Sequence, residues 1–372
     1  MKVLHKFIPL ASPDIQEQDI DATIQVLRSG MLVQGEKVQL FEEDVARFLG
    51  VKHAICASNG TATLHMALVA LGIGQGDEVI VPAFSYIATA NVVELVGATP
   101  IFVDIDLATY NIDISKVEQA ISPKTKAIIP VHEFGLASDI VALKSIAEGK
   151  NIALIEDAAC ALGAKEDNRF VGTFGDFASF SLHPRKAISS GEGGILTTND
   201  DALAEKIRIL RNHGISYHDG KMNFVAAGFN YRLTDFQAAL VHSQFARLDQ
   251  TLRYKQELAK VYFQEIDSKK IKLPFIPDKK QHTWQTFHVL LDDSIDRGRL
   301  INELKREGVG TNYGAQCIPY QEYYSLKYNL NCQMLYPNAL KAYNHGLALP
   351  LYEKLTKEEI AFVSNTICKL IN

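Results

Sequence analysis

The stretch AICASNGTATLHMAL, residues 54–68, decides the fold class of this chain. It opens with a short apolar run, passes through the polar triplet at residues 58–60, and continues with helical spacing at Leu64, Ala67 and Leu68. A strand that leads directly into a helix is the repeating unit of parallel α/β sheets.

The same pattern repeats outward from this stretch. The apolar runs that follow are VIV (79–81), IFV (101–103), AIIPV (127–131) and IALI (152–155). Because they are uninterrupted, we expect strands covered on both faces, with function at their carboxyl ends. Two later runs, FASFSL (177–182) and GGILTT (193–198), have little room between them for a crossover helix. We therefore predict that the sheet changes direction there.

The length of 372 residues allows about two domains of ~100–200 residues each. A long helical stretch, predicted from Thr234 to Ile266, separates the α/β pattern from a more aromatic and irregular C-terminal part. We place the boundary within it, which gives a large domain, 1–245, including an N-terminal arm, and a small domain, 246–372.

Composition excludes several classes of protein. The net charge of −5 gives no sign of the basic surface that proteins use to bind nucleic acid or an anionic membrane. The N-terminus MKVLHKFIPL does not match a secretory signal, and no run of about 18 apolar residues occurs, so we expect a soluble cytoplasmic protein. Five scattered cysteines argue against a disulfide framework or a zinc site, and we predict no metal.

The familiar phosphate-binding loops are missing from the sequence. GIGQGD (72–77) closes a helix and leads into a strand, which is the reverse of the dinucleotide-binding order, so we interpret it as a helix C-cap and turn. No G-x-x-x-x-G-K-[ST] motif occurs.

A better anion site begins at residue 58. A strand ends there and a helix is predicted to start at Thr61, so backbone N–H groups and the positive end of the helix dipole face outward together. The alternative is that Asn59 or Thr61 only caps the helix.

A second polar group follows the run at 152–155. Alternation along a strand sends Glu156 and Asp157 to opposite sides. An acid at this edge of the sheet could be a helix cap, a metal ligand or a partner for a cationic ring nitrogen.

Lys186 lies in FSLHPRKAISSGEGG (180–194), after the next strand end. An isolated lysine is usually a solvated charge. Together, however, a phosphate-binding helix start, an acid at a strand end and a lysine on the neighbouring loop are the three groups that pyridoxal phosphate requires.

At these residues the sequence resembles the DegT/DnrJ/StrS family of sugar-nucleotide aminotransferases, a branch of the fold-type-I pyridoxal phosphate enzymes. The resemblance covers nearly the whole chain, from IPLASPDI (8–15) to PNALKAYNHGLALPLYEKLT (337–356), through GDEVIVPAFSYIATANVVELVG (76–97), IIPVHEFG (128–135), IEDAACALGA (155–164) and GFNYRLTDFQAAL (228–240). It implies a mostly parallel seven-stranded sheet flanked by helices, with a smaller C-terminal α+β domain.

The resemblance also implies roles for individual residues. Lys186 would be the Schiff-base lysine and Asp157 the partner of the ring nitrogen, while the other cofactor contacts would come from Gly60, Thr61, Tyr86, Ser181 and Asn230. Tyr86 would stack on the ring, although an ordinary core aromatic is the alternative. Asn230 would reach the phosphate of the neighbouring subunit, although an Asn between two aromatics is more often a turn residue.

One position departs from the family pattern. Three residues after the aspartate, relatives commonly have Gln, Glu or His, and this chain has Cys160. Cysteine is a weak hydrogen-bond donor, so the ring oxygen needs another partner.

We therefore expect a homodimeric aminotransferase with shared active sites. It would move an amino group, from L-glutamate, onto a nucleotide-linked keto-sugar, forming an amino sugar for cell-surface polysaccharide or another glycoconjugate. One alternative is a pyridoxal phosphate-dependent sugar dehydratase, whose relatives usually have histidine at the position of Lys186. Another is a non-catalytic regulatory protein on the same scaffold.

Overall fold

The computed structural model describes residues 7–371, so the first six residues of the predicted N-terminal arm lie outside it. Its main feature is a seven-stranded sheet in the order β1-β10-β9-β6-β5-β2-β4. The strands are β1 (His53–Ala57), β2 (Glu78–Pro82), β4 (Thr99–Val103), β5 (Thr125–Ile128), β6 (Ala153–Asp157), β9 (Phe177–Ser181) and β10 (Gly194–Thr198). Each overlaps one of the apolar runs from which a strand was predicted.

The sheet is mostly parallel, as expected. The pairs β4/β2, β2/β5, β5/β6 and β6/β9 are parallel, whereas β10 pairs antiparallel with both of its neighbours. The predicted change of direction between residues 182 and 193 is therefore confirmed, and β10 runs against the other six strands. Those six strands place their carboxyl ends at one edge of the sheet.

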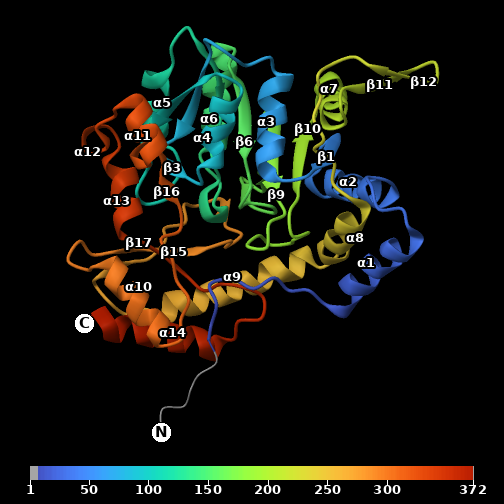
Figure 1. Ribbon diagram of the computed structural model, residues 1–372. Coiled ribbons are helices and arrows are strands. Elements are labelled where there is room, and N and C mark those ends of the chain that lie inside the picture. The colour runs from blue at the N-terminus through green and yellow to red at the C-terminus, as the bar shows by residue number, and fades with distance from the viewer. Residues whose placement is uncertain (1–6, 372) are drawn as a thin grey trace.

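Helices cover both faces of this sheet (Figure 1). On one face, Ile55, Val79 and Val81 pack with α3 (Gly60–Ala70), α4 (Ala88–Leu95) and α7 (Asp201–Arg211). On the other face the strands pack with α2 (Glu36–Leu49), α5 (Ile114–Ala120), α6 (Ile140–Lys150) and α8 (Asp235–Phe245). Successive strand residues thus enter different cores, which explains why the runs are apolar without alternation.

A second apolar core lies towards the C-terminus. It surrounds a three-stranded antiparallel sheet, ordered β13 (Ile271–Lys272), β15 (Phe287–Leu291) and β17 (Gly346–Leu349). The helices α9 (Leu248–Glu265), α10 (Arg297–Arg306) and α14 (Lys357–Ile371) pack on it. In contrast, α11 (Glu322–Tyr328), α12 (Cys332–Leu335) and α13 (Pro337–His345) contribute apolar side chains to the core of the large sheet.

The prediction of one long helix from Thr234 to Ile266 is wrong. The chain forms α8 and α9 with a break at Ala246 and Arg247, and the backbone of Arg247 is not helical, with φ −110° and ψ 12°. The Arg247 guanidinium donates to both carboxylate oxygens of buried Asp19, at 2.8 and 2.6 Å. This contact joins the break to α1 (Glu17–Ser29), which is distant in sequence. Neither Ala246 nor Arg247 is a helix-breaking residue, so the sequence does not mark the break.

Short strand pairs complete the structure. They are the hairpin β11 (Ile215–His218) and β12 (Lys221–Phe224), the pair β3 (Phe84–Ser85) and β16 (Gln316–Cys317), and the sheet of β14 (Lys280–Gln281), β7 (Lys165–Glu166) and β8 (Arg169–Phe170). The hairpin projects away from the body of the molecule (Figure 1). Across residues 7–371, no helix is both long and apolar enough to cross a membrane.

Candidate active site

The carboxyl ends of the parallel strands surround a cavity of about 740 Å³. Six of the seven predicted site residues line it: Gly60, Thr61, Tyr86, Asp157, Ser181 and Lys186. They come from segments up to 126 residues apart in the chain, so the fold brings the predicted groups together at the edge where ligands bind in parallel α/β sheets.

One end of the cavity is formed by the start of α3. The helix begins at Gly60, one residue before the predicted Thr61, and the Asn59 side chain caps it by accepting a hydrogen bond from the Ala62 N–H at 2.8 Å. A Cβ on Gly60 would lie 3.3 Å from the Ser181 Cβ, so the Gly60 backbone and the Ser181 side chain are in close approach. Capping by Asn59 leaves the first amides of the helix available for an anion.

The neighbouring carboxylates of β6 point to opposite sides, as predicted. Glu156 is buried away from the cavity, where it accepts hydrogen bonds from three backbone amides at 2.7–2.9 Å and lies 3.0 Å from His132 Nε2. Burial acts to raise the pKa of Glu156, but His132 and the amides outweigh it and hold that pKa below its usual value. Glu156 is therefore a structural acid that ties the loop at 172–175 to the sheet.

Asp157 faces the cavity and keeps fewer partners. Its carboxylate accepts from the Thr89 hydroxyl at 2.8 Å and from the Ala159 N–H at 3.2 Å. Burial raises the pKa of Asp157, although both donors and the charge of Lys186 act against that rise. A carboxylate that is buried, oriented and not paired internally with a cation is suited to hold a positive charge on a ligand.

Lys186 lies opposite, with its Nζ donating to the Cys160 Sγ at 3.0 Å. Burial raises the pKa of the Cys160 thiol, while the charge of Lys186 lowers it. A thiol is a weak acceptor, so the lysine amine is held in place by a partner that it can readily leave.

Neither Tyr86 nor Asn230 is buried in a core of the protein. Tyr86 lines the cavity with 66% of its surface exposed, so the alternative of an ordinary core aromatic is wrong. Asn230 is exposed, forms a bridge with Asn212 and does not line the cavity. A contact of Asn230 with this cavity is therefore not made within one chain, and its predicted role in a neighbouring subunit stays a prediction.

The sequence did not reveal three groups at the site. Thr89 binds Asp157 from α4, Glu133 enters from the turn after β5, and Gln285 comes from the C-terminal part of the chain. Thr89 and Glu133 lie inside the family-like segments FSYIAT and IIPVHEFG, which was the available signal. Gln285 lies in an irregular loop that no local pattern connects to the sheet.

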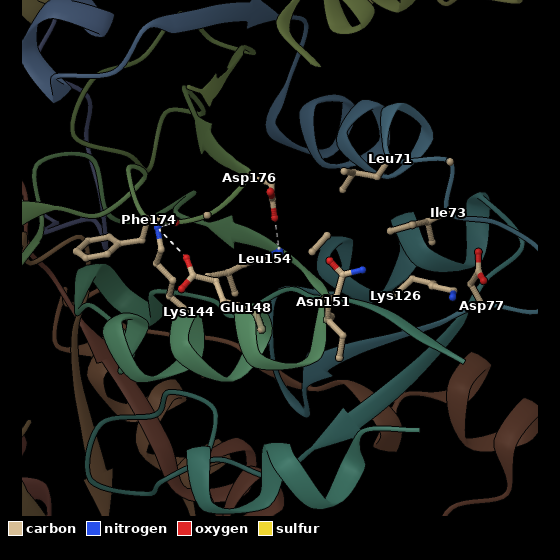
Figure 2. Close-up of a pocket in the computed structure, with 15 residues that line it drawn as sticks. Leu71, Ile73, Asp77, Lys126, Lys144, Glu148, Asn151, Leu154, Phe174 and Asp176 are labelled. Atoms are coloured by element: carbon tan, nitrogen blue, oxygen red, sulfur yellow. Dashed lines mark hydrogen bonds and ion pairs between the residues drawn. The ribbon is translucent and has the colours of Figure 1, made fainter. Parts of the chain in front are cut away.

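A second cavity, of about 780 Å³, lies at the opposite edge of the sheet, where β2, β5, β6 and β9 begin (Figure 2). Three of its charged groups hold the fold together. Asp77 accepts from the Gly74 N–H at 3.0 Å, Asp176 from the Leu154 N–H at 2.8 Å, and Lys144 donates to the Phe174 carbonyl at 3.0 Å. These groups hold loops to strand ends, so the chemistry is expected at the carboxyl edge.

Comparison with known proteins identifies the scaffold. Residues 13–368 match the model of the DegT/DnrJ/EryC1/StrS aminotransferase family. The chain belongs to this family. It is 35% identical over 381 residues to the spore coat polysaccharide biosynthesis protein SpsC of Bacillus subtilis, an alignment that covers 98% of this chain and 97% of SpsC.

Solved structures agree with this assignment. The putative sugar aminotransferase Spr1654 of Streptococcus pneumoniae, in its PLP form, superposes with a TM-score of 0.93 at 28% identity and covers 98% of both chains. Helicobacter pylori PseC, described as an aminotransferase involved in pseudoaminic acid biosynthesis, has a TM-score of 0.93 at 27% identity, covering 98% of this chain and 99% of PseC. The expected fold is confirmed, and the chain is a pyridoxal phosphate-dependent aminotransferase.

The residues of the cavity fit that cofactor. The start of α3 beside Ser181 has free backbone amides that suit a phosphate. Gly194 of β10 packs directly against this backbone, because a Cβ at Gly194 would come within 2.7 Å of the Asn59 and Gly60 backbone. Asp157 and Lys186 supply the acid and the amine that the cofactor requires. When bound, the cofactor supplies a ring that accepts the electron pair of the bond being broken.

Proposed function

We propose that this enzyme moves an amino group from L-glutamate to a nucleotide-linked keto-sugar, in the cytoplasm, and so makes an amino sugar for cell-surface polysaccharide or another glycoconjugate. The observation that carries the proposal is the convergence of Lys186, Asp157 and the start of α3 on one cavity of about 740 Å³. SpsC belongs to spore coat polysaccharide biosynthesis, PseC to pseudoaminic acid biosynthesis, and Spr1654 is a putative sugar aminotransferase, and these relatives favour a sugar substrate.

Each residue of the cavity would have its own role in binding the cofactor or in proton transfer. The amides of Gly60 and Thr61, with the Ser181 hydroxyl, would hold the phosphate, and Tyr86 would cover one face of the ring. Asp157, oriented by Thr89, would keep the ring nitrogen protonated. The amine of Lys186 would take a proton from the carbon that carries the amino group and later return one, as general base and acid.

The substrate is tested by incubating the purified enzyme with glutamate and a panel of nucleotide-linked keto-sugars. We expect an aminated sugar and 2-oxoglutarate in equal amounts, identified by mass spectrometry and NMR. A product that has lost a hydroxyl without gaining nitrogen would indicate the dehydratase alternative. Cofactor binding without conversion of any sugar in the panel would contradict the proposed substrate class.

The proposal includes a homodimer with shared sites. Asn230 is exposed in one chain and lies outside its own cavity, which leaves it available to a neighbouring site. We also propose the division into domains 1–245 and 246–372, with the break between α8 and α9 as the connection. The separate core around Tyr262, Phe287 and Leu347 supports the boundary, whereas α11–α13 of the small domain pack on the core of the large sheet.

Shared sites are tested by subunit mixing. Asn230→Ala and Lys186→Ala homodimers should both be poorly active. In a mixed dimer one site carries both defects and the other carries neither, so each heterodimer should regain up to about half of the native turnover. Verified heterodimers without recovered activity would exclude the shared site.

A further inference from the structure

Arg185 places a permanent positive charge next to the reactive lysine. It directly precedes Lys186 and lines the same cavity of about 740 Å³. Its side chain is half-buried, and its guanidinium makes no hydrogen bond or ion pair with any of residues 7–371. An arginine keeps its charge at every physiological pH and presents planar donors that fit a carboxylate. This charge is therefore available to an anion that enters the cavity.

The backbone of Arg185 is fixed from two sides. Its N–H donates to His183 Nδ1 at 3.2 Å, and its carbonyl accepts a hydrogen bond from Gln285 Nε2 at 3.0 Å. Gln285 is held in turn, because its N–H donates to the Phe134 carbonyl at 3.1 Å and its Oε1 accepts from the Thr286 hydroxyl at 2.8 Å. The fold thus sets where the arginine side chain begins, while the charged end has no partner.

The other basic side chains that line the cavity are neutral or already used. Lys186 is required for the cofactor and for proton transfer. Burial lowers the pKa of His65. Burial also lowers the pKa of His183, although Glu192 acts against the shift, and the charges of Lys186 and Arg185 add to it. Both rings are therefore neutral at pH 7, and Arg185 is the remaining cation among the described residues that line the cavity.

The cavity also contains acids, which disfavour an anionic substrate. Asp157 and Glu133 are buried in its wall, and Glu192 lines it as an exposed residue. None of these three acids makes an ion pair with Arg185. Because like charges repel and a carboxylate removed from water needs a partner, a substrate carboxylate in this cavity is most stable against Arg185.

The proposed reaction supplies such a carboxylate in one of its two halves. L-glutamate has one carboxylate on the carbon that loses its amino group and a second at the end of its side chain. A nucleotide-linked keto-sugar has its phosphates away from the reacting carbon. We propose that Arg185 binds a carboxylate of the amino donor and so selects an amino acid for the first half of the reaction. The inference rests on the proposed function, because that function supplies the donor.

The first half-reaction tests this inference without any sugar. The enzyme loaded with pyridoxal phosphate is mixed with L-glutamate, and the conversion of the cofactor to its amino form is followed by absorbance in a single turnover. We expect Arg185→Gln to raise the Kd for glutamate about 10–100-fold, the effect of losing a hydrogen bond to a charged group. Arg185→Lys keeps the charge but loses the planar donors, so it should raise the Kd less.

The matched control is Arg253→Gln, which alters an exposed arginine on α9 outside the cavity. It should keep the native Kd for glutamate. A native Kd in Arg185→Gln as well would overturn the proposal.

The cofactor phosphate is the competing anion, and titration of the cofactor-free enzyme with pyridoxal phosphate separates the two. Arg185→Gln should weaken cofactor binding far less than glutamate binding. An equal loss for both would place Arg185 on the phosphate and overturn the proposal. L-alanine then distinguishes the two carboxylates of the donor. An equal loss for alanine and glutamate assigns the carboxylate on the reacting carbon, and a loss confined to glutamate assigns the side-chain carboxylate.

The second half-reaction separates this inference from the proposed sugar substrate. The amino form of the enzyme is mixed with a nucleotide-linked keto-sugar that has no carboxyl group. The loss in Arg185→Gln should be at least about 10-fold larger for glutamate than for the sugar. A loss confined to the sugar half would overturn the proposal. Failure of every sugar would leave the glutamate result unchanged, so the two failures are distinguishable.

Discussion

The two edges of the large sheet carry cavities of similar volume, about 740 and 780 Å³, and both contain lysines and acids. At the amino edge, Asp77 and Asp176 accept backbone amides and Lys144 donates to a carbonyl. At the carboxyl edge, Asp157 and Glu133 are buried with raised pKa values, and Lys186 contacts only a thiol among the hydrogen bonds described for its side chain. Charge and volume therefore do not distinguish an active site. The active site differs because its charged side chains are not all used in hydrogen bonds that hold the backbone together.

The largest expected difference between the two edges comes from the lysines. Lys186→Ala should reduce turnover by at least about 10²–10⁴-fold, because the proton transfer at the reacting carbon is lost. Lys144→Ala removes one hydrogen bond and a partly exposed ion pair, so it should leave kcat unchanged and cost about 1 kcal/mol of stability. Steady-state kinetics and urea unfolding check both results. Equal effects of the two variants on turnover would remove the distinction.

The acids give the next contrast. Asp157→Asn should lower kcat on the order of 10²–10³-fold, because a neutral amide cannot stabilise a positive ring nitrogen. Asp176→Asn retains an oxygen that can accept the Leu154 N–H and should keep near-native turnover. Circular dichroism should show both variants folded. Near-normal kcat in Asp157→Asn would exclude its electrostatic role.

The smallest contrast is in the pH dependence of stability. The pKa of Glu133 is raised to about 8 in the folded chain from an ordinary value near 4.5, so the folded state binds more protons than the unfolded state between these values. Stability is then fully present below pH 4.5 and falls as the pH rises towards 8. Glu133→Gln should lack this loss, which amounts to a few kcal/mol at most.

The control is Glu148→Gln at the rim of the other cavity, where the side chain is 68% exposed. It should keep the native pH dependence of unfolding. A native profile that is parallel to that of Glu133→Gln would show that Glu133 is not protonated in the folded state.

The contrast between local and distant signals also explains what the sequence could predict. The strands and the functional edge of the sheet could be predicted, because each apolar run and the polar residues that follow it are adjacent in the chain, as in 152–157. Asp157 and Lys186 followed from motifs on two neighbouring loops. The break at Arg247 could not be predicted because no proline or glycine marks it, and the Asp19 that Arg247 binds lies 228 residues away.

The same reason hid the supports of the site. Thr89 orients Asp157 through a contact between segments 68 residues apart, and a threonine at the start of a helix is by itself typical of a helix cap. The pairing of Lys186 with Cys160 was equally unreadable, because it depends on how two loops meet.

The central claim is that the carboxyl edge holds the cofactor on Lys186, and covalent trapping tests it most directly. The cofactor-loaded enzyme is reduced with borohydride, digested and examined by mass spectrometry. We predict one modified peptide, with the mass of the reduced cofactor on Lys186, and none on Lys144 or Lys126 at the other cavity. Modification at any other lysine, or no modification of a protein that has bound the cofactor, would contradict the account.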